Sequence, residues 1–177
     1  MNILVVMDTD EKQRQWFETA AKGAKVTFCP GDGSEAGAAL EEADVIIGNI
    51  DPNLVRKAKH LKWLQLNSAG AGSYCKPGIL PDGVALTNAT GAYGLALSEH
   101  MLAQSLAMMK KLYLYHDNQH QSLWRDEGPV TPFYGATVVV VGFGDIGRNF
   151  GRRVKALGAY VIGLRRRRGE VPPEADE

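Results

Sequence analysis

The feature that most constrains the fold of this chain is a glycine motif at residues 142–147, with the spacing G-x-G-x-x-G. It follows a β-branched run at residues 137–141 and precedes a helix-like segment from about residue 146 to 157. Its three glycines permit a tight turn, a close approach of the backbone to a pyrophosphate, and close packing of helix on strand. The helix N-terminus adds free N–H groups and a positive dipole end. The motif therefore predicts a strand–turn–helix unit that binds a dinucleotide. The predicted cofactor-binding residues are Gly142, Phe143, Gly144, Asp145, Ile146 and Gly147.

The alternative interpretation is a glycine-rich turn that joins strand to helix and binds nothing. The predicted strand and helix on either side of the motif make it the weaker interpretation.

A run of four arginines, at positions 165 to 168, ends the next predicted strand, residues 159–164. In dinucleotide-binding folds, the residue at this position meets the adenosine ribose. An Asp or Glu would accept hydrogen bonds from the ribose 2′-OH, whereas guanidinium groups suit a 2′-phosphate. We therefore predict that Arg165 and Arg166 bind the cofactor and that NADP is preferred over NAD. The alternative is a solvated charge run or a general anion patch.

Upstream of the motif, strand-like and helix-like segments alternate, which predicts a parallel sheet covered by helices. The predicted strands are residues 2–7, 25–28, 45–47, 63–66 and 84–87, and the predicted helices are residues 11–22 and 35–43 with a short helix after Pro52. A segment from residue 95 to about 120 lacks Pro and Gly and has apolar residues at helical spacing. We predict one long helix there, at a domain boundary.

A loop of small residues, 68–72, comes directly after the predicted strand 63–66. It therefore lies at the carboxyl end of a strand, where open α/β sheets bind ligands. The alternative is a plain strand-to-helix turn. The last residues, 171–177, are acidic and rich in proline, which is typical of a disordered end or a cut loop.

The charges balance, with 20 Lys plus Arg against 20 Asp plus Glu, so we expect neither a nucleic-acid nor a membrane partner. The chain has no run of about 18 apolar residues and no secretory signal, which predicts a soluble protein. Cys29 and Cys75 lie far apart without a C-x-x-C neighbour and are interpreted as reduced thiols. The expected location is cytoplasmic.

The histidines give no catalytic or metal site. His116 and His120 have the i, i+4 spacing of a metal-binding pair, but two ligands without a nearby Cys or carboxylate pattern favour a polar helix face. His100 follows Glu99 at the start of the predicted long helix and is interpreted as structural, and His60 has no recognisable partner. We assign no metal ligand and no catalytic residue.

Four separated landmarks in one order resemble the D-isomer-specific 2-hydroxyacid dehydrogenases over essentially the whole chain. They are Asn67-Ser68-Ala69-Gly70-Ala71-Gly72, Thr87-Asn88-Ala89, Ser98-Glu99-His100 and Val141-Gly142-Phe143-Gly144-Asp145-Ile146-Gly147-Arg148. The resemblance implies an α/β protein with a flavodoxin-like parallel-sheet substrate domain at residues 1–95. It also implies that residues 96–177 begin a Rossmann NAD(P)-binding domain with its first βαβ unit and are incomplete. The family commonly pairs through that domain and its first helix, so a homodimer is expected.

The family exchanges a hydride between NAD(P)H and C2 of a small 2-keto or 2-hydroxy acid. Its small-residue loop lies beside the substrate and the nicotinamide, so the resemblance implies that backbone N–H groups of this loop hold the substrate carboxylate. The implied substrate-binding residues are Ser68, Ala69, Gly70, Ala71 and Gly72, with Ala71 also at the cofactor. The family's catalytic Arg, Glu and His are expected downstream of residue 177.

We therefore expect a truncated chain whose parent protein is an oxidoreductase using NADP or NAD. Glyoxylate, hydroxypyruvate and pyruvate are candidate substrates. The alternative is a non-catalytic fragment with at most nucleotide-binding or dimerisation capacity, and a different Rossmann enzyme or a cofactor-sensing regulator is a third hypothesis. A Rossmann domain cut after its second strand is expected to leave apolar edges and not to behave as an independent domain.

Overall fold

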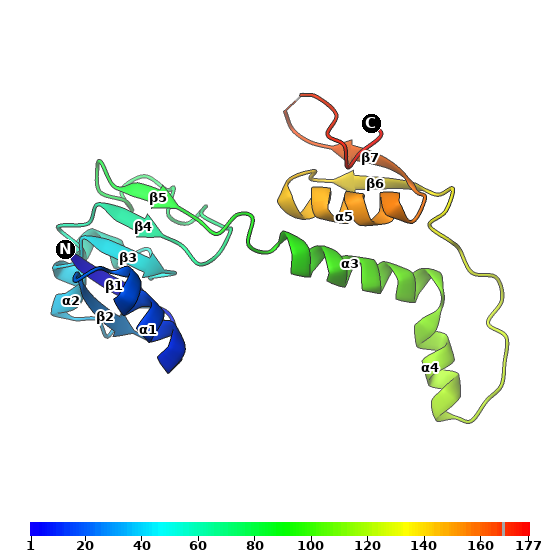
Figure 1. Cartoon of the computed structure of the whole chain (residues 1–177), viewed down its shortest axis with the longest axis horizontal. Helices are drawn as coiled ribbons and strands as arrows, with labels where there is room; N and C mark the ends of the chain where they lie inside the picture. Colours follow the sequence, from blue (N-terminus) through cyan, green and yellow to red (C-terminus); the bar gives the residue numbers. More distant parts are fainter. Residues whose placement is uncertain (168) are drawn as a thin grey trace. The chain divides into compact units, whose positions relative to one another are not determined.

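The computed structural model describes residues 1–167 and 169–177, and Arg168 of the predicted arginine run lies outside the described residues. The chain divides into two compact units, Met1–Thr90 and Gly91–Glu177. Both are α/β units built on parallel strands (Figure 1), so the predicted fold class is confirmed. None of the helices in the described ranges combines the length and apolar character that a membrane span requires.

The first unit is a five-stranded, entirely parallel sheet with the strand order β2-β1-β3-β4-β5. Its strands are β1 (Asn2–Val6), β2 (Lys25–Cys29), β3 (Val45–Gly48), β4 (Trp63–Gln65) and β5 (Ala85–Thr87). The central strands β1 and β3 are apolar along most of their length because helices and loops cover both faces of a parallel sheet. All five strands agree with the predicted runs to within about two residues.

Three short helical segments connect these strands: α1 (Glu11–Ala20), α2 (Ala38–Glu41) and the 3-10 segment η1 (Val55–Lys57). The helix α1 begins where Asp10 and Gln13 form a reciprocal capping box. The sheet brings together a core of fully buried side chains. Its largest members are Leu4, Ile46, Ile50, Leu64 and Leu66.

The second unit contains α3 (Gly94–Met109), α4 (Leu112–His120), β6 (Thr137–Val141), α5 (Asp145–Ala156) and β7 (Tyr160–Leu164). The strands β6 and β7 are parallel, with Val141 opposite Leu164 at their carboxyl ends. In Figure 1, α5 lies against this pair of strands and α3 lies against α5. The core between them is built from aromatic and β-branched side chains. It contains Phe133, Val140, Phe143, Phe150, Val154 and Val161.

One face of the β6–β7 pair has no covering layer in the described part of the chain. Val140 and Val161 point towards α5, whereas alternate residues point away from it. Val139 is 54% exposed and Val141 is 83% exposed. Strand β6 therefore has the sequence of a strand buried on both faces, but only its α5 side is buried.

The predicted single helix from residue 95 to about 120 is wrong, because the chain breaks between α3 and α4. Lys111 takes a left-handed conformation with φ 55°, which ends one helix and starts the next at a different angle (Figure 1). The break is stabilised by contacts that helical periodicity does not reveal. Thr131 donates its N–H to the Met109 carbonyl at 3.1 Å, and the Lys111 ammonium donates to the Glu127 carbonyl.

The predicted disorder of residues 171–177 is also wrong. Asp176 donates its N–H to the Val161 carbonyl at 2.7 Å, and Gly163 donates to the Glu177 carbonyl at 2.7 Å, so this segment lies along β7. The Glu174 carboxylate is buried against Arg148 and Arg152. Acidic composition predicts solvation only when no basic partner is near, and here α5 supplies the partners.

Candidate functional site

The glycine motif forms the turn between β6 and α5, and two of its glycines are required by the fold itself. Gly142 has φ 92°, a conformation that other residues rarely adopt. A Cβ on Gly147 would lie 2.3 Å from the Gly142 carbonyl oxygen, so only glycine allows α5 to pack this closely on the turn. These two positions therefore shape the strand–turn–helix unit whether or not a ligand is bound.

Gly144 is different, because a Cβ built on it would meet no protein atom within 4 Å. It is the N-cap residue of α5 and no side chain caps the helix there. The first N–H groups of a helix have no partner inside the helix, and they attract anions. Among the described residues nothing fills the space at Gly144. The turn therefore fits a pyrophosphate approaching the backbone.

The other motif residues divide between the core and the rim of this turn. Phe143 is buried, and a Cβ on Gly151 or Gly163 would come within 2.8 Å of its ring. The Phe143 N–H donates to the Leu164 carbonyl at 3.1 Å. Asp145 and Ile146 are partly buried in the first turn of α5, where Asp145 accepts a hydrogen bond from Asn149 at 3.2 Å.

The arginines follow β7 at the same edge of the two-stranded sheet as the glycine turn. Gly142 donates its N–H to the Leu164 carbonyl at 2.9 Å, so Arg165 comes one residue after a direct neighbour of the turn. Arg165 and Arg166 are exposed. The Arg165 guanidinium donates to the Glu170 carbonyl at 2.7 Å. This bond holds one donor, and the remaining donors are available to an anion.

In the first unit, the loop of residues 68–72 lies where three parallel strands end. The Ser68 hydroxyl lies 3.1 Å from the Gly70 carbonyl and 3.3 Å from the side-chain oxygen of Asn49, which follows β3. Asn88, which follows β5, donates its amide to the Ala69 carbonyl at 2.8 Å. The loop is therefore held in place from both neighbouring strands.

The N–H groups of this loop are the donors that an anionic ligand would use. Within the residues that the structure describes, the N–H groups of Gly70, Ala71 and Gly72 donate no hydrogen bond to the chain. A Cβ on Gly70 or Gly72 would meet nothing within 4 Å. Ala71 also borders a hollow of about 490 Å³ together with Cys75 and Asn88. The loop has the free donors and the open space that binding a carboxylate requires.

The structure gives no described histidine a catalytic setting. His60 and His100 are exposed. Glu99 contacts Arg153 at 3.3 Å and so links α3 to α5. His116 and His120 lie together on exposed turns of α4, with their Nε2 atoms 3.1 Å apart.

Two features of the second unit were missed from the sequence. The first is the pairing of the acidic end segment with α5, where Arg148, Arg152 and Lys155 face Glu174 and Asp176. The Arg152 guanidinium, more than any other group, lowers the pKa of Glu174. The spacing of these basic residues by four and three positions marks one face of a helix and was the available signal.

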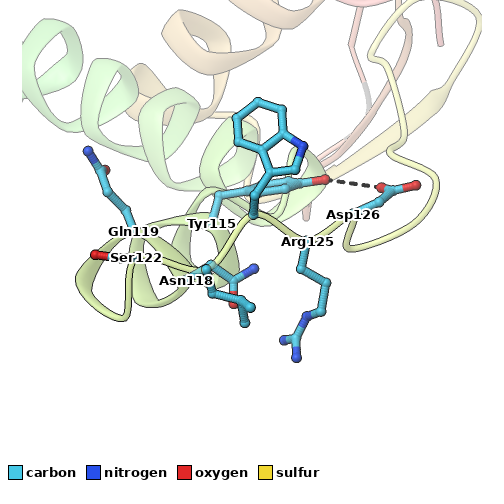
Figure 2. A pocket seen from close by; sticks show the side chains of 8 residues that line it. Tyr115, Asn118, Gln119, Ser122, Arg125 and Asp126 are labelled. Carbon is cyan, nitrogen blue, oxygen red and sulfur yellow. Dashed lines mark hydrogen bonds between the residues drawn. The ribbon is translucent and has the colours of Figure 1, made fainter.

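The second missed feature is a hollow of about 630 Å³ at the end of α4 (Figure 2). Tyr115, Asn118 and Asp126 line it, together with the fully exposed Trp124. The Tyr115 hydroxyl lies 3.4 Å from a carboxylate oxygen of Asp126, and Asn118 donates to Glu127 at 2.6 Å. An exposed tryptophan in a polar segment gives no periodic pattern, so only the fold locates it.

Comparison with known proteins matches part of this chain to one protein family. Residues 102–177 match the model of "D-isomer specific 2-hydroxyacid dehydrogenase, NAD binding domain". The chain is similar to the D-isomer specific 2-hydroxyacid dehydrogenases, and residues 102–177 are the part that matches their NAD-binding domain. The resemblance drawn from the four sequence landmarks is therefore confirmed.

Curated relatives and solved structures show the same similarity. D-3-phosphoglycerate dehydrogenase of Mycobacterium tuberculosis (strain ATCC 25618 / H37Rv) is 27% identical over 168 residues, which are 92% of this chain and 32% of that protein. A solved D-isomer specific 2-hydroxyacid dehydrogenase family protein from Aeromonas salmonicida is 27% identical with a TM-score of 0.80, and covers 99% of this chain and 56% of its own. D-lactate dehydrogenase from Aquifex aeolicus, solved with NAD and lactic acid, has a TM-score of 0.78 at 20% identity and supports the fold.

The chain spans about a third of the length of the D-3-phosphoglycerate dehydrogenases it matches and just over half of the solved chains. Its shared part with the family includes the NAD-binding domain from residue 102 onwards.

Proposed function

We propose that the protein containing these 177 residues transfers a hydride between a nicotinamide dinucleotide and C2 of a small 2-keto or 2-hydroxy acid. The observation that carries the proposal is the turn at residues 142–147, where an uncapped helix and open space at Gly144 meet in a chain similar to this family. When bound, the nicotinamide supplies the hydride to the carbonyl carbon, and a proton on the oxygen completes the 2-hydroxy acid.

In this proposal the second unit binds the nucleotide through the backbone of the glycine turn. The N–H groups at the start of α5 bind the pyrophosphate, and Gly144 leaves room for it. The loop of residues 68–72 in the first unit binds the substrate carboxylate through N–H groups that have no partner in the described chain. The proposal assigns no acid–base residue within the described ranges.

The test is a nucleotide titration of the protein and of the Gly144→Ala variant. A methyl group at Gly144 meets no protein atom within 4 Å but occupies the space proposed for the pyrophosphate. We expect the variant to keep the thermal stability of the parent and to bind nucleotide at least about tenfold more weakly. If the parent and the Gly144→Ala variant bound NADPH equally tightly, and NADH equally tightly, the result would contradict the proposed site.

We propose further that NADP is preferred and that Arg165 and Arg166 contact its 2′-phosphate. Both side chains are exposed at the edge of the sheet that carries the glycine turn. Arg165→Asp should weaken NADPH binding by about 10- to 100-fold and NADH binding much less, because only NADPH carries the phosphate. The control is Arg56→Asp on η1, which makes the same change of charge in the other unit. Equal losses for the two nucleotides would remove Arg165 from this role.

The substrate class is tested by NADPH oxidation with glyoxylate, hydroxypyruvate and pyruvate. Turnover with at least one of them is the expected result for the natural polypeptide, whose intact mass is measured in the same preparation. The 177 residues account for 19.2 kDa. Nucleotide binding without turnover in a protein of this mass would favour the alternative of a non-catalytic, nucleotide-binding chain.

A homodimer in the cytoplasm completes the proposal. Exposed apolar side chains on α3 and α4 support it, since Leu95, Met108 and Tyr113 are all more than half exposed. Sedimentation of the protein tests the oligomeric state, and a monomer at all concentrations would contradict the dimer.

A further inference from the structure

Two histidines on α4 lie in a geometry that the proposed activity does not use. His116 and His120 occupy consecutive turns, with their ring planes at 77° and their centroids 4.4 Å apart. Their Nε2 atoms are 3.1 Å apart. Two nitrogens that share one ion at bond lengths of about 2.0–2.1 Å lie about 2.9–3.4 Å apart for angles near 90–110°. The spacing of the two atoms is therefore the spacing of a chelating pair.

The backbone that carries the two rings is fixed from the opposite side of the helix. Asn118, between them in sequence, is buried and donates to the Glu127 carboxylate at 2.6 Å. The N–H of Leu123 donates to the Asn118 carbonyl at 2.9 Å, which ties the helix end to the following segment (Figure 2 shows Asn118 at this turn). Residues two positions from Asn118 point away from it, into solvent. The pair is thus exposed on a helical turn that is already ordered.

A neighbouring carboxylate orients one of the rings. Asp117 Oδ1 lies 3.5 Å from His116 Nδ1. A carboxylate on this side favours a hydrogen on Nδ1 and leaves the lone pair on Nε2, as it does for histidine ligands of metal ions. The present contact between the two Nε2 atoms requires a hydrogen on one of them. Binding of an ion requires that hydrogen to exchange, through water, to Nδ1 of the same ring.

We propose that His116 and His120 bind one divalent late-transition-metal ion through their Nε2 atoms. Two imidazoles select copper, nickel and zinc over calcium and magnesium, and copper binds most tightly in the usual order of stability. Among residues 1–167 and 169–177, no group of three or more His, Cys, Asp or Glu side chains is arranged for a metal ion, so water fills the remaining positions. The site is a surface chelate that crosslinks the last two turns of α4 and is independent of the nucleotide site.

The test is calorimetric titration of the full chain with Cu²⁺ and Ni²⁺ salts in a buffer that does not chelate them. The expected result is one ion per chain at the pair, and at least about tenfold weaker binding in His116→Asn and in His120→Asn. A matched control moves one ring without changing the composition: His120→Gln combined with Gln121→His. Five positions of separation place the rings about 140° apart around the helix, so this variant should bind as weakly as the single ones.

His60→Asn and His100→Asn remove exposed single histidines and should leave the tight site unchanged. An affinity of the rearranged variant equal to that of the parent would overturn the proposal, as would an equal loss in the His60 and His100 variants. Amide exchange gives a second readout, because the bound ion should slow exchange in α4 of the parent and leave that of the rearranged variant unchanged.

Discussion

The two units of this chain use the same alternation of strand and helix but differ in how completely they bury it. In Met1–Thr90, five parallel strands place Leu4, Ile46 and Leu64 in a core with almost no exposure. In Gly91–Glu177, two parallel strands are buried on the α5 side and exposed on the other. The same sequence type, a run of β-branched residues, thus gives a closed layer in one unit and an open layer in the other.

With only two strands, the second unit has other contacts that hold its helices and strands together. The second unit gains close contacts from glycines, at Gly147 against Gly142 and at Gly151 against Phe143. It also gains the irregular segment of residues 171–177, which hydrogen-bonds to β7 and forms ion pairs with α5. Both units therefore bury an apolar core, and the second adds close backbone contacts and ion pairs to a smaller one.

The strongest test of this contrast is Gly147→Ala. The added methyl group would lie 2.3 Å from a backbone oxygen, so α5 must move away from β6. We expect a loss of about 3–5 kcal/mol confined to the second unit. Thermal unfolding monitored by amide exchange in each unit measures it, with Gly144→Ala as the control that adds the same methyl group to open space. Equal destabilisation by the two variants would mean that the turn does not pack as described.

The next effect concerns acid. Glu174 is 6% exposed, and the guanidinium of Arg152, with that of Arg148, holds the pKa of its carboxyl below the usual range. Because the folded pKa is depressed, this pair stabilises the second unit at neutral pH and is lost as the pH falls through the folded pKa. Glu174→Gln should therefore melt at a lower temperature than the parent at neutral pH.

The difference between the two proteins should be constant above the ordinary Glu pKa of about 4.3 and shrink as the pH falls from there through the lower pKa of the folded carboxyl. Melting curves across this range are the measurement. A difference that stays constant with pH would assign the effect of Glu174 to packing and not to charge.

A smaller effect is expected in the first unit from Tyr74→Phe. The buried Tyr74 hydroxyl donates to the Ile50 carbonyl at 2.6 Å, and burial raises the pKa of this hydroxyl. Its removal leaves a buried acceptor without a partner, which costs about 1–3 kcal/mol. Denaturant unfolding should show this loss in the first unit alone. An equal loss of stability in both units would show that the two units do not unfold independently.

The smallest effect should follow Val141→Thr on the open face of β6. The side chain is 83% exposed, so replacing a methyl group by a hydroxyl of similar size removes little burial. We expect a change within about 0.5 kcal/mol. A loss several times larger in the natural protein would show that this face is covered there.

Local pattern was sufficient for most of the fold. The strands were predicted correctly because short runs of β-branched residues, such as those of β3 and β6, favour a strand over a helix. The glycine turn was located because its spacing and flanking elements agree. Both are properties of residues that are neighbours in sequence.

The failures came where distant residues decide. The break at Lys111 depends on Thr131 and Glu127, and the order of the end segment depends on Arg148 and Arg152. The spacing of Arg148 and Arg152 marks a basic face of a helix, but spacing alone does not say which acidic segment that face binds. The histidine pair shows the same limit, since the spacing of His116 and His120 was visible but the 3.1 Å separation of their ring nitrogens was not.

The placement of the three tryptophans makes the chain its own optical reporter. Trp16 and Trp63 belong to the first unit, whereas Trp124 stands fully exposed at the end of α4. An indole that is already hydrated changes its emission little on unfolding and shifts to shorter wavelength when another surface covers it. The emission of Trp124 should therefore change little when the chain melts, and it should shift when another molecule covers the indole. In the first unit Trp16 is also largely exposed, so Trp63, 40% exposed and donating its indole N–H to the Thr87 hydroxyl at 2.6 Å, is the tryptophan that reports unfolding of that unit.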